Sequence, residues 1–360
     1  MAEGLAPSAL LARVRRDVDR SLLRTRNGLK FLSGVDRPGV GLSPKEAVWK
    51  RDKVELWRYD SDQRRLRPPV LLVMSLVSRS FILDLRPGNS FVEFLLGEGF
   101  DVFLIDWGVP DELEAGNRLE TYCDEYLPDI VDAVTAVSGD RGVTVYGYCF
   151  GGVLSLLYAA GHPGPPMENL AVMATPVDFS RMGPMSSFLQ EGRIEVDDLL
   201  DESGNVPPEA IADSFKVLKP TADLTTYANL WQNLWRDEFV EGYQAMTQWT
   251  ADHIPFPGAC FRQTVDLFNR QNLLATGEVP LGGRTVRLKD IRVPFLNVVA
   301  EKDHIVPSEA IGKLSEMVGS DDAEDLRLDA GHVGLVVGRS AHKQTLPALA
   351  DWLRRHSQPA

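Results

Sequence analysis

The stretch GVTVYGYCFGG at residues 142–152 gives the strongest local signal in the sequence. An apolar run ends at Gly147, and the residues VLSLLYAA that follow Gly152 are typical of a helix. The pattern Gly-x-Cys-x-Gly at such a junction is typical of a strained strand-to-helix turn that presents a nucleophile, with small residues that let strand and helix approach closely. We therefore predict that Cys149 is a nucleophile and that the backbone N–H of Phe150 donates to a developing oxyanion.

Other apolar runs, on both sides of this turn, indicate the strands of one sheet. They are continuous rather than alternating, as expected for parallel strands that are buried on both faces. Segments of helical length lie between them, for example at 89–99 and 121–140, so the chain alternates strand and helix as in an open α/β sheet. The runs are PVLLVMS (69–75), DVFLIDW (101–107), GVTVYG (142–147), LAVMATP (170–176) and VPFLNVVA (293–300).

The sequence also predicts a base for this nucleophile and a carboxylate that orients the base. In the α/β-hydrolase fold the chain order is nucleophile, acid, histidine. Asp303 follows the predicted strand at 293–300, and His332 lies in a glycine-flanked loop within LRLDAGHVGLV (326–336). We therefore predict an α/β-hydrolase fold with a mostly parallel central sheet, and a triad of Cys149, Asp303 and His332.

Between about Val177 and Leu288 the pattern changes, because strong strand signals disappear and aromatic residues become frequent. We interpret this segment as a mainly helical cap inserted after one strand, although its aromatic residues could equally form the core of a small second domain. Ligands bind at the carboxyl ends of the strands of such sheets, so an insertion there would cover the site and exclude water. The predicted organisation is an N-terminal helical extension at 1–40, a core at 41–176 and 289–360, and a cap at 177–288.

Three further residues are candidates for the site. A second oxyanion donor normally comes from the loop after an earlier strand, which makes Val77, or its neighbour Leu76, the candidate. Arg79 in the same loop is a candidate phosphate contact, with a surface salt bridge as the alternative. His304 adjoins Asp303 and could contact substrate or help to position the loop.

Composition excludes several classes of protein. The 360 residues carry 38 Lys and Arg against 51 Asp and Glu, a formal charge of −13, which argues against a nucleic-acid partner. The cysteines lie far apart and form no CxxC pair, so we expect no disulfide framework and no metal site. Cys123 and Cys260 have no glycine frame and no nearby base, and we expect both to be inert. We expect no cofactor, and, without a membrane-spanning run or a secretion signal, a cytoplasmic location.

Near the N-terminus, SALLARVRRDVDRSLLR at 8–24 predicts an amphipathic helix with arginines between its apolar positions. One interpretation is a terminal helix that packs on the body of the protein. The other is a docking surface for a partner subunit or for an apolar granule, because a basic amphipathic helix can lie on such an interface. The apolar stripe comprises Leu10, Leu11, Val14, Val18, Leu22 and Leu23.

The motifs GYCFGG, AEKDHIVP (300–307) and DAGHVG (329–334) resemble those of polyhydroxyalkanoate synthases. The similarity covers about residues 40 to 355, and at this length the chain is similar to the short catalytic subunits of the two-subunit type. Other stretches that resemble the family are DVFLIDWGVPD (101–111), MATPVDFS (173–180), Trp249-x-x-Asp252 within QWTADHIPFPG, NLLATGEVPLGGRTVRLKDI (272–291) and MVGSDDAEDLRL (317–328).

The resemblance implies roles for the predicted triad. Cys149 would be the acylated nucleophile, His332 the general base, and Asp303 would orient His332 or help to deprotonate the incoming hydroxyl. The implied substrate is an (R)-3-hydroxyacyl-CoA, polymerised to polyester with release of coenzyme A. The implied state is a homodimer with a non-catalytic partner subunit at the surface of polyester granules. A thioester or lactone hydrolase with the same triad and a granule-associated scaffold remain alternatives, and the intact triad argues against the scaffold.

Overall fold

A central sheet of eight strands organises the structure, a computed structural model that describes residues 7–33, 38–218 and 229–360. The strand order is β1-β2-β5-β4-β6-β7-β12-β13. The pairs β1–β2 and β2–β5 are antiparallel, and all pairs from β5 to β13 are parallel. The strands are β1 (Lys45–Arg51), β2 (Val54–Tyr59), β4 (Val70–Val73), β5 (Val102–Asp106), β6 (Val143–Tyr148), β7 (Met167–Met173), β12 (Phe295–Ala300) and β13 (Ala323–Leu328).

Each of the five apolar runs forms a strand, which confirms the predicted mostly parallel sheet of an α/β fold. Strands β4, β6 and β12 are buried at every residue, as a continuous apolar run predicts. Strands β1, β2 and β13 were not predicted, because they lie toward the edges of the sheet and contain partly exposed or exposed residues. Two strands of two residues each, β3 (Leu66–Arg67) and β14 (Gln358–Pro359), pair with each other outside the central sheet.

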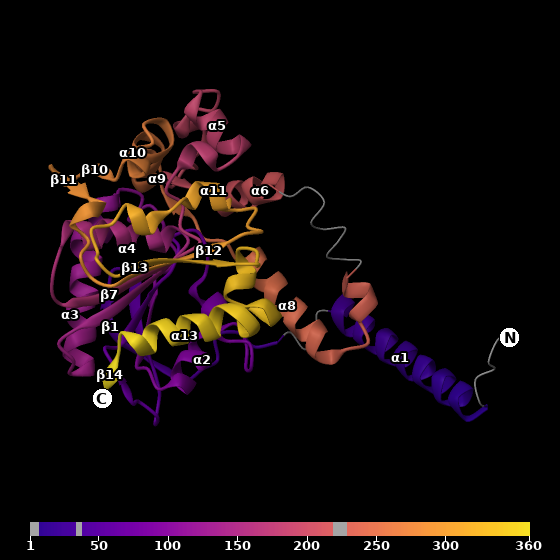
Figure 1. The fold of residues 1–360 in the computed structure, drawn as a ribbon. Helices are drawn as coiled ribbons and strands as arrows, with labels where there is room; N and C mark the ends of the chain where they lie inside the picture. Colours follow the sequence, from indigo (N-terminus) through magenta and orange to yellow (C-terminus); the bar gives the residue numbers. More distant parts are fainter. Residues whose placement is uncertain (1–6, 34–37, 219–228) are drawn as a thin grey trace.

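Helices cover both faces of the sheet (Figure 1). Successive strand residues point to opposite faces, so Leu71 and Val73 of β4 join one apolar core while Val70 and Leu72 join the other. The first core includes α3 and α4, and the second includes α2 and α13. The helices at 89–99 and 121–140 are confirmed, the latter with a π-helical first turn. These helices are α2 (Phe91–Glu98), α3 (Leu127–Ser138), α4 (Phe150–Gly161) and α13 (Leu346–Arg355), with the π-helical turn at Thr121–Tyr126.

Between β7 and β12 the described residues, 174–218 and 229–294, are mainly helical, but they also form four short strands that the sequence did not predict. These strands have two or four residues, too few to give a periodic signal. The division into core and cap stays a prediction. The elements are α5 (Pro184–Gln190), β8 (Asn205–Val206), α6 (Pro208–Leu218), α8 (Asp237–Ala251), β9 (Phe256–Pro257), α9 (Gly258–Thr264), α10 (Leu273–Thr276), β10 (Glu278–Leu281) and β11 (Arg284–Arg287); α11 (Ser308–Ile311) and α12 (Gly338–Ser340) follow β12 and β13.

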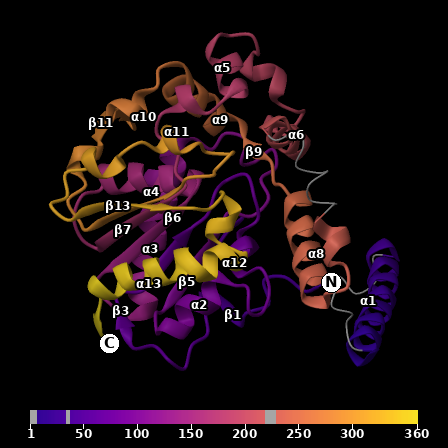
Figure 2. The same cartoon turned by 45° about the vertical axis from the view of Figure 1, so that its right-hand side comes forward.

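Helix α1 (Pro7–Ser33) projects from the body beside α8, as Figure 2 shows. The Asn27 side chain is buried and donates to the backbone oxygen of Leu234 and to Asp237 at the start of α8, both at 2.8 Å. Val18 and Leu22, two residues of the predicted stripe, are exposed instead. The stripe residues Leu10, Leu11 and Val14 lie outside the side chains that the structure describes, as do residues 1–6 and 34–37 of the predicted extension.

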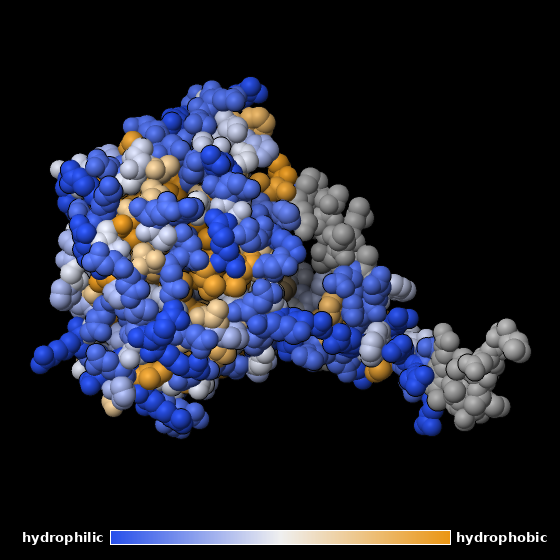
Figure 3. Space-filling view, viewed as in Figure 1, coloured by the Kyte–Doolittle hydropathy of each residue, from blue (hydrophilic) through white to orange (hydrophobic). Residues whose placement is uncertain are grey.

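Apolar residues reach the surface mainly in the central part of the body in the view of Figure 3, and the described part of α1 is mainly hydrophilic there. None of the described helices is long and apolar enough to cross a membrane.

The packing of α4 against β4 leads to a stability prediction. A Cβ atom on Gly151 would lie 2.1 Å from the backbone oxygen of Val73, in the middle of the sheet, where the neighbour cannot move aside. We expect Gly151→Ala to lower the free energy of unfolding by about 1–3 kcal/mol in urea titrations. Gly97→Ala in α2 is the matched control, since no heavy atom lies within 4 Å of that Cβ position. A Gly151→Ala protein as stable as the control would contradict this packing.

Candidate active site

Cys149 lies at the turn between β6 and α4, with backbone angles φ 57° and ψ −124°. Such a conformation is unfavourable for a residue with a Cβ, by about 1–3 kcal/mol, and it persists only where surrounding structure fixes it. The Cys149 N–H donates to the Met173 oxygen on β7, and the Gly152 N–H donates to the Cys149 oxygen, both at 2.9 Å. The half-buried thiol is therefore held at the carboxyl end of the sheet, where the sequence placed it.

Asp303 and His332 meet at the same end of the sheet, because Asp303 follows β12 and His332 follows β13. Both are buried, and His332 Nδ1 lies 2.6 Å from Asp303 Oδ2. A carboxylate can only accept, so Nδ1 is the donor and Nε2 is left for another partner. The other carboxylate oxygen of Asp303 accepts from the backbone N–H groups of Ile305 and Val306 at 2.8 and 2.9 Å, which fixes its orientation.

The pKa of His332 depends on its burial and on its two neighbours, Cys149 and Asp303. Burial by itself lowers the pKa of His332, because it disfavours the imidazolium. The charges of Cys149 and Asp303, and hydrogen bonds to both, outweigh this effect and raise the pKa of His332 to about 10. The imidazole therefore lies between a carboxylate on one side and the Cys149 sulfur on the other, and both neighbours favour its protonated form.

Tyr148 belongs to the same cluster, although no sequence pattern predicted its role. Its hydroxyl donates to the backbone oxygen of His332 at 3.2 Å, and the two rings lie 5.1 Å apart. Burial raises the pKa of Tyr148 well above its usual value, so the hydroxyl stays a neutral donor. The only sequence signal was its position next to Cys149, because the contact depends on a loop far along the chain.

The two predicted oxyanion donors lie on neighbouring pieces of backbone. The close approach of Gly151 to the oxygens of Val73 and Met74 places the start of α4 against the end of β4, from which the loop 75–79 continues. Among the described residues, the N–H groups of Phe150 and Val77 have no hydrogen-bond acceptor, and the same is true of Leu76. Both loop residues therefore stay candidates for the second donor.

The remaining candidates have other surroundings. Arg79 Nε lies 3.3 Å from Asp252 Oδ2, so the salt bridge considered as the alternative is formed. His304 is exposed, and its side chain makes no hydrogen bond or ion pair within the described part of the chain, while the adjacent Asp303 points inward. Cys123 and Cys260 are fully buried, and burial raises the pKa of both thiols, which favours the unreactive thiol form.

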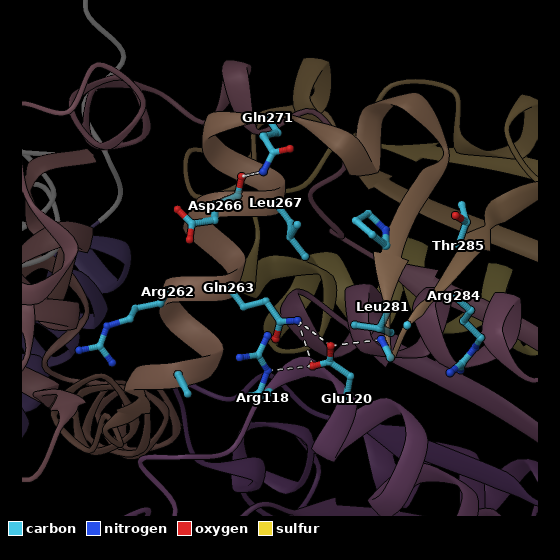
Figure 4. Close-up of a pocket in the computed structure, with 14 residues that line it drawn as sticks. Arg118, Glu120, Arg262, Gln263, Asp266, Leu267, Gln271, Leu281, Arg284 and Thr285 are labelled. Atoms are coloured by element: carbon cyan, nitrogen blue, oxygen red, sulfur yellow. Dashed lines mark hydrogen bonds and ion pairs between the residues drawn. The ribbon is translucent and has the colours of Figure 1, made fainter.

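A hollow of about 790 Å³ lies elsewhere, between α9, the following π-helical turn and the β10–β11 hairpin (Figure 4). Its charged groups are paired within the protein. The Glu120 carboxylate accepts from Gln263 and from the backbone of Gly282, while Arg262 pairs with Asp197 and Arg284 with Asp124. Neither Cys149 nor His332 lines it, and we assign no ligand to it. No group of three potential metal ligands occurs among the described residues.

The chain is similar to known proteins over most of its length. A family model described as alpha/beta hydrolase fold matches residues 68–338. The "Poly(3-hydroxyalkanoate) polymerase subunit PhaC" of Allochromatium vinosum is 36% identical over 332 residues, which cover 91% of this chain and 92% of that protein. The protein of the same name from Thiocystis violacea is 35% identical, with coverages of 92% and 93%. The one from Haloferax mediterranei is 36% identical over 90% of this chain but only 66% of its own length.

Solved structures share the fold at much lower identity. A thermophilic esterase from Thermogutta terrifontis, with malate bound, superimposes with a TM-score of 0.51 at 18% identity and covers 87% of this chain and 99% of the esterase. A putative lipase from Acinetobacter baumannii gives a TM-score of 0.50 at 12% identity, covering 94% and 96%. At these identities the likeness shows the fold alone. Together, the family model and the relatives that match nearly end to end show that this chain belongs to the poly(3-hydroxyalkanoate) polymerase family, within the α/β-hydrolase fold.

Proposed function

We propose that this protein is an acyltransferase that polymerises (R)-3-hydroxyacyl-CoA to polyhydroxyalkanoate polyester, with release of coenzyme A, through a covalent acyl-enzyme on Cys149. The observation that carries the proposal is the contact of Cys149 with a buried His332 that is oriented by Asp303, in a member of a polyester polymerase family.

Acylation begins with the Cys149–His332 pair. The sulfur attacks the carbonyl carbon of the substrate thioester, and negative charge develops on the carbonyl oxygen. The N–H groups of Phe150 and of Val77 or Leu76 would stabilise that oxyanion, each by about 3 kcal/mol. When the tetrahedral intermediate collapses, the coenzyme A sulfur leaves and takes a proton from His332 Nε2. One thioester replaces another, so the acyl-enzyme is close in free energy to the substrate and stays reactive.

Elongation also uses His332, but here the histidine accepts a proton instead of donating one. His332, now neutral, accepts the proton of the 3-hydroxyl group of another acyl unit, and the resulting alkoxide attacks the thioester carbon on Cys149. The ester bond forms, the carbon–sulfur bond breaks, and the Cys149 thiolate is again paired with the protonated His332. Asp303 keeps its charge throughout and stabilises the imidazolium.

The acyl-enzyme has to be protected from water, and residues 177–288 are the proposed means. From this segment, Phe256 lies 5.4 Å from the ring of Phe150, next to the nucleophile. Met182 and Cys149 pack against the same small apolar cluster, formed by Val299, Val306, Ala310 and Ile311. Apolar side chains of the proposed cap therefore border the thiol. A hydrolase of thioesters or lactones would use the same triad but would have an open path for water. A granule-associated scaffold would not need the triad.

We also propose that the protein acts as a homodimer with a non-catalytic partner subunit, at the surface of polyester granules in the cytoplasm. The relatives named above are described as subunits, which supports a partner. Val18, Leu22 and Leu29 of α1 are 53%, 66% and 65% exposed, and six basic residues between Arg15 and Lys30 accompany them. Such a helix suits an apolar surface.

The central test mixes purified protein, with and without a candidate partner subunit, with (R)-3-hydroxybutyryl-CoA, and follows free coenzyme A and insoluble polyester. We expect both products from the wild type and neither from Cys149→Ala. Cys260→Ala is the matched control, because it also removes one thiol but from an inert, buried position. Coenzyme A release with only free 3-hydroxybutyrate would indicate the hydrolase, and activity in Cys149→Ala would contradict the covalent step.

The pairing of His332 can be tested without substrate. Because the negative charge of Cys149 is the largest of the effects that raise the pKa of His332, Cys149→Ala should lower that pKa. Wild-type His332 should thus stay cationic at pH 8, and the neutral form should appear at lower pH in the variant than in the wild type. Nitrogen chemical shifts of labelled histidine, assigned with His332→Gln, report the titration. Identical titrations in wild type and Cys149→Ala would disprove the pairing.

The exposed residues of α1 give a separate prediction. Replacing Val18, Leu22 and Leu29 by serine removes apolar area, so binding to polyhydroxybutyrate nanoparticles should weaken several-fold in a sedimentation assay. Leu113→Ser is the control, since Leu113 is 80% exposed and lies away from α1. Equal binding of the triple variant and the control would exclude this face as the granule contact.

A further inference from the structure

The segment from Trp249 to Phe256, here called the clamp segment, lies directly against the loop 75–79. The backbone N–H of Ile254 donates to the Val77 oxygen at 3.4 Å, and His253 Nδ1 lies 3.3 Å from the same oxygen. Ser78 and His253 are paired as an antiparallel bridge. Two groups of the clamp segment therefore hold one carbonyl of the loop that contains the candidate oxyanion donor.

The clamp segment is attached on both sides of this contact. Before it, Trp249 Nε1 donates to the Arg79 oxygen at 2.9 Å, in addition to the Arg79–Asp252 ion pair. After it, Phe256 packs edge-on against Phe150, the residue that carries the other candidate donor. One stretch of the proposed cap thus contacts both sides of the predicted oxyanion hole.

His253 has surroundings that keep its ring in place and uncharged. It is half-buried, with the rings of Phe215 and Trp249 at 5.3 and 6.4 Å. Burial lowers the pKa of His253, so the neutral imidazole, with one N–H, prevails at neutral pH. A carbonyl oxygen can only accept, so Nδ1 carries the hydrogen and donates it to Val77.

We propose that His253 is a positioning residue for the oxyanion hole, which acts by holding the Val77 carbonyl and thereby directing the N–H groups of the Leu76–Val77 turn. This inference rests on the proposed function and deepens it. Two hydrogen bonds to one carbonyl restrict rotation of that backbone, and oxyanion donors are effective only when they are held in place before charge develops. Loss of the His253 bond leaves the bond from Ile254, so the loop loosens without being released.

The effect should appear in kcat rather than KM, because the oxyanion exists in the transition state and not in the bound substrate. Removing a donor outright costs about 10²–10³-fold in kcat, so loosening one donor should cost roughly 10-fold. Three replacements separate the hydrogen bond from the bulk of the ring. His253→Asn can place an N–H near the position of Nδ1, His253→Gln places its amide farther out, and His253→Leu has no donor.

The first experiment measures coenzyme A release from (R)-3-hydroxybutyryl-CoA. We expect kcat to fall roughly 10-fold in His253→Leu and His253→Gln at unchanged KM, and to stay within about 3-fold of wild type in His253→Asn. If the leucine variant does not fold, the glutamine variant still tests the loss of the hydrogen bond. Wild-type kcat in both the leucine and the glutamine variants would overturn the proposal, as would an equal loss in all three.

A second measurement excludes a merely structural role. Alkylation of Cys149 by iodoacetamide forms no oxyanion, so its rate in folded His253→Leu or His253→Gln should equal that of the wild type. Slower alkylation in step with the loss of kcat would overturn the proposal, because His253 would then act on the nucleophile or on the fold.

Failure of the proposed function can be distinguished from failure of this inference. If the wild type releases no coenzyme A, single-turnover acylation of Cys149 by a p-nitrophenyl ester still forms an oxyanion and can be compared between variants. Slow acylation in the glutamine variant with near-normal acylation in the asparagine variant would support the role of His253 whatever the natural substrate. Equal acylation in all variants would overturn it.

Discussion

The close contact of α4 with β4 and β7 is the constraint on which the site depends. Cys149 has a backbone conformation that a residue with a side chain rarely adopts, so the turn needs rigid structure on both sides. The sheet supplies one side through the hydrogen bond to Met173, and Gly151 after the turn lets the helix approach the backbone oxygen of Val73 at the end of β4. The stability of the core therefore maintains a turn that is unfavourable by itself, and it leaves the thiol at the end of the sheet.

Electrostatics explains why the buried Asp303 and His332 can lie together beside the half-buried Cys149. A single buried imidazolium would be unstable, and burial alone lowers the pKa of His332. Its position between Asp303 and Cys149 reverses that effect, while Asp303 is itself satisfied by two backbone N–H groups. Each group is thus stabilised by the next. Tyr148, the residue before Cys149, also donates a hydrogen bond to the backbone oxygen of His332.

Sequence patterns predicted the parts of the fold that are buried on both sides and the residues that short motifs frame. The parallel strands β4, β5, β6, β7 and β12 belong to the first class, and Cys149, Asp303 and His332 belong to the second. Strands β1, β2 and β13 escaped prediction because partly exposed strands have no continuous apolar run. The roles of Tyr148 and His253 were not predicted, for another reason. Their contacts are with backbone oxygens of distant loops, and a backbone oxygen is the same in every residue, so no local pattern can reveal the partner.

The position of the insertion follows from these contacts. Cys149, His332 and Asp303 all follow strands of the central sheet, but the loop 75–79 pairs with no described strand of that sheet. Its backbone is instead paired with His253 and Ile254, which belong to the segment between β7 and β12, and the Arg79 side chain pairs with Asp252 of the same segment. In this arrangement the segment that would exclude water would also fix the geometry of the candidate oxyanion donor in that loop. The position of this one segment would then both cover the acyl-enzyme and help to stabilise its formation. Displacement of the segment would weaken both effects.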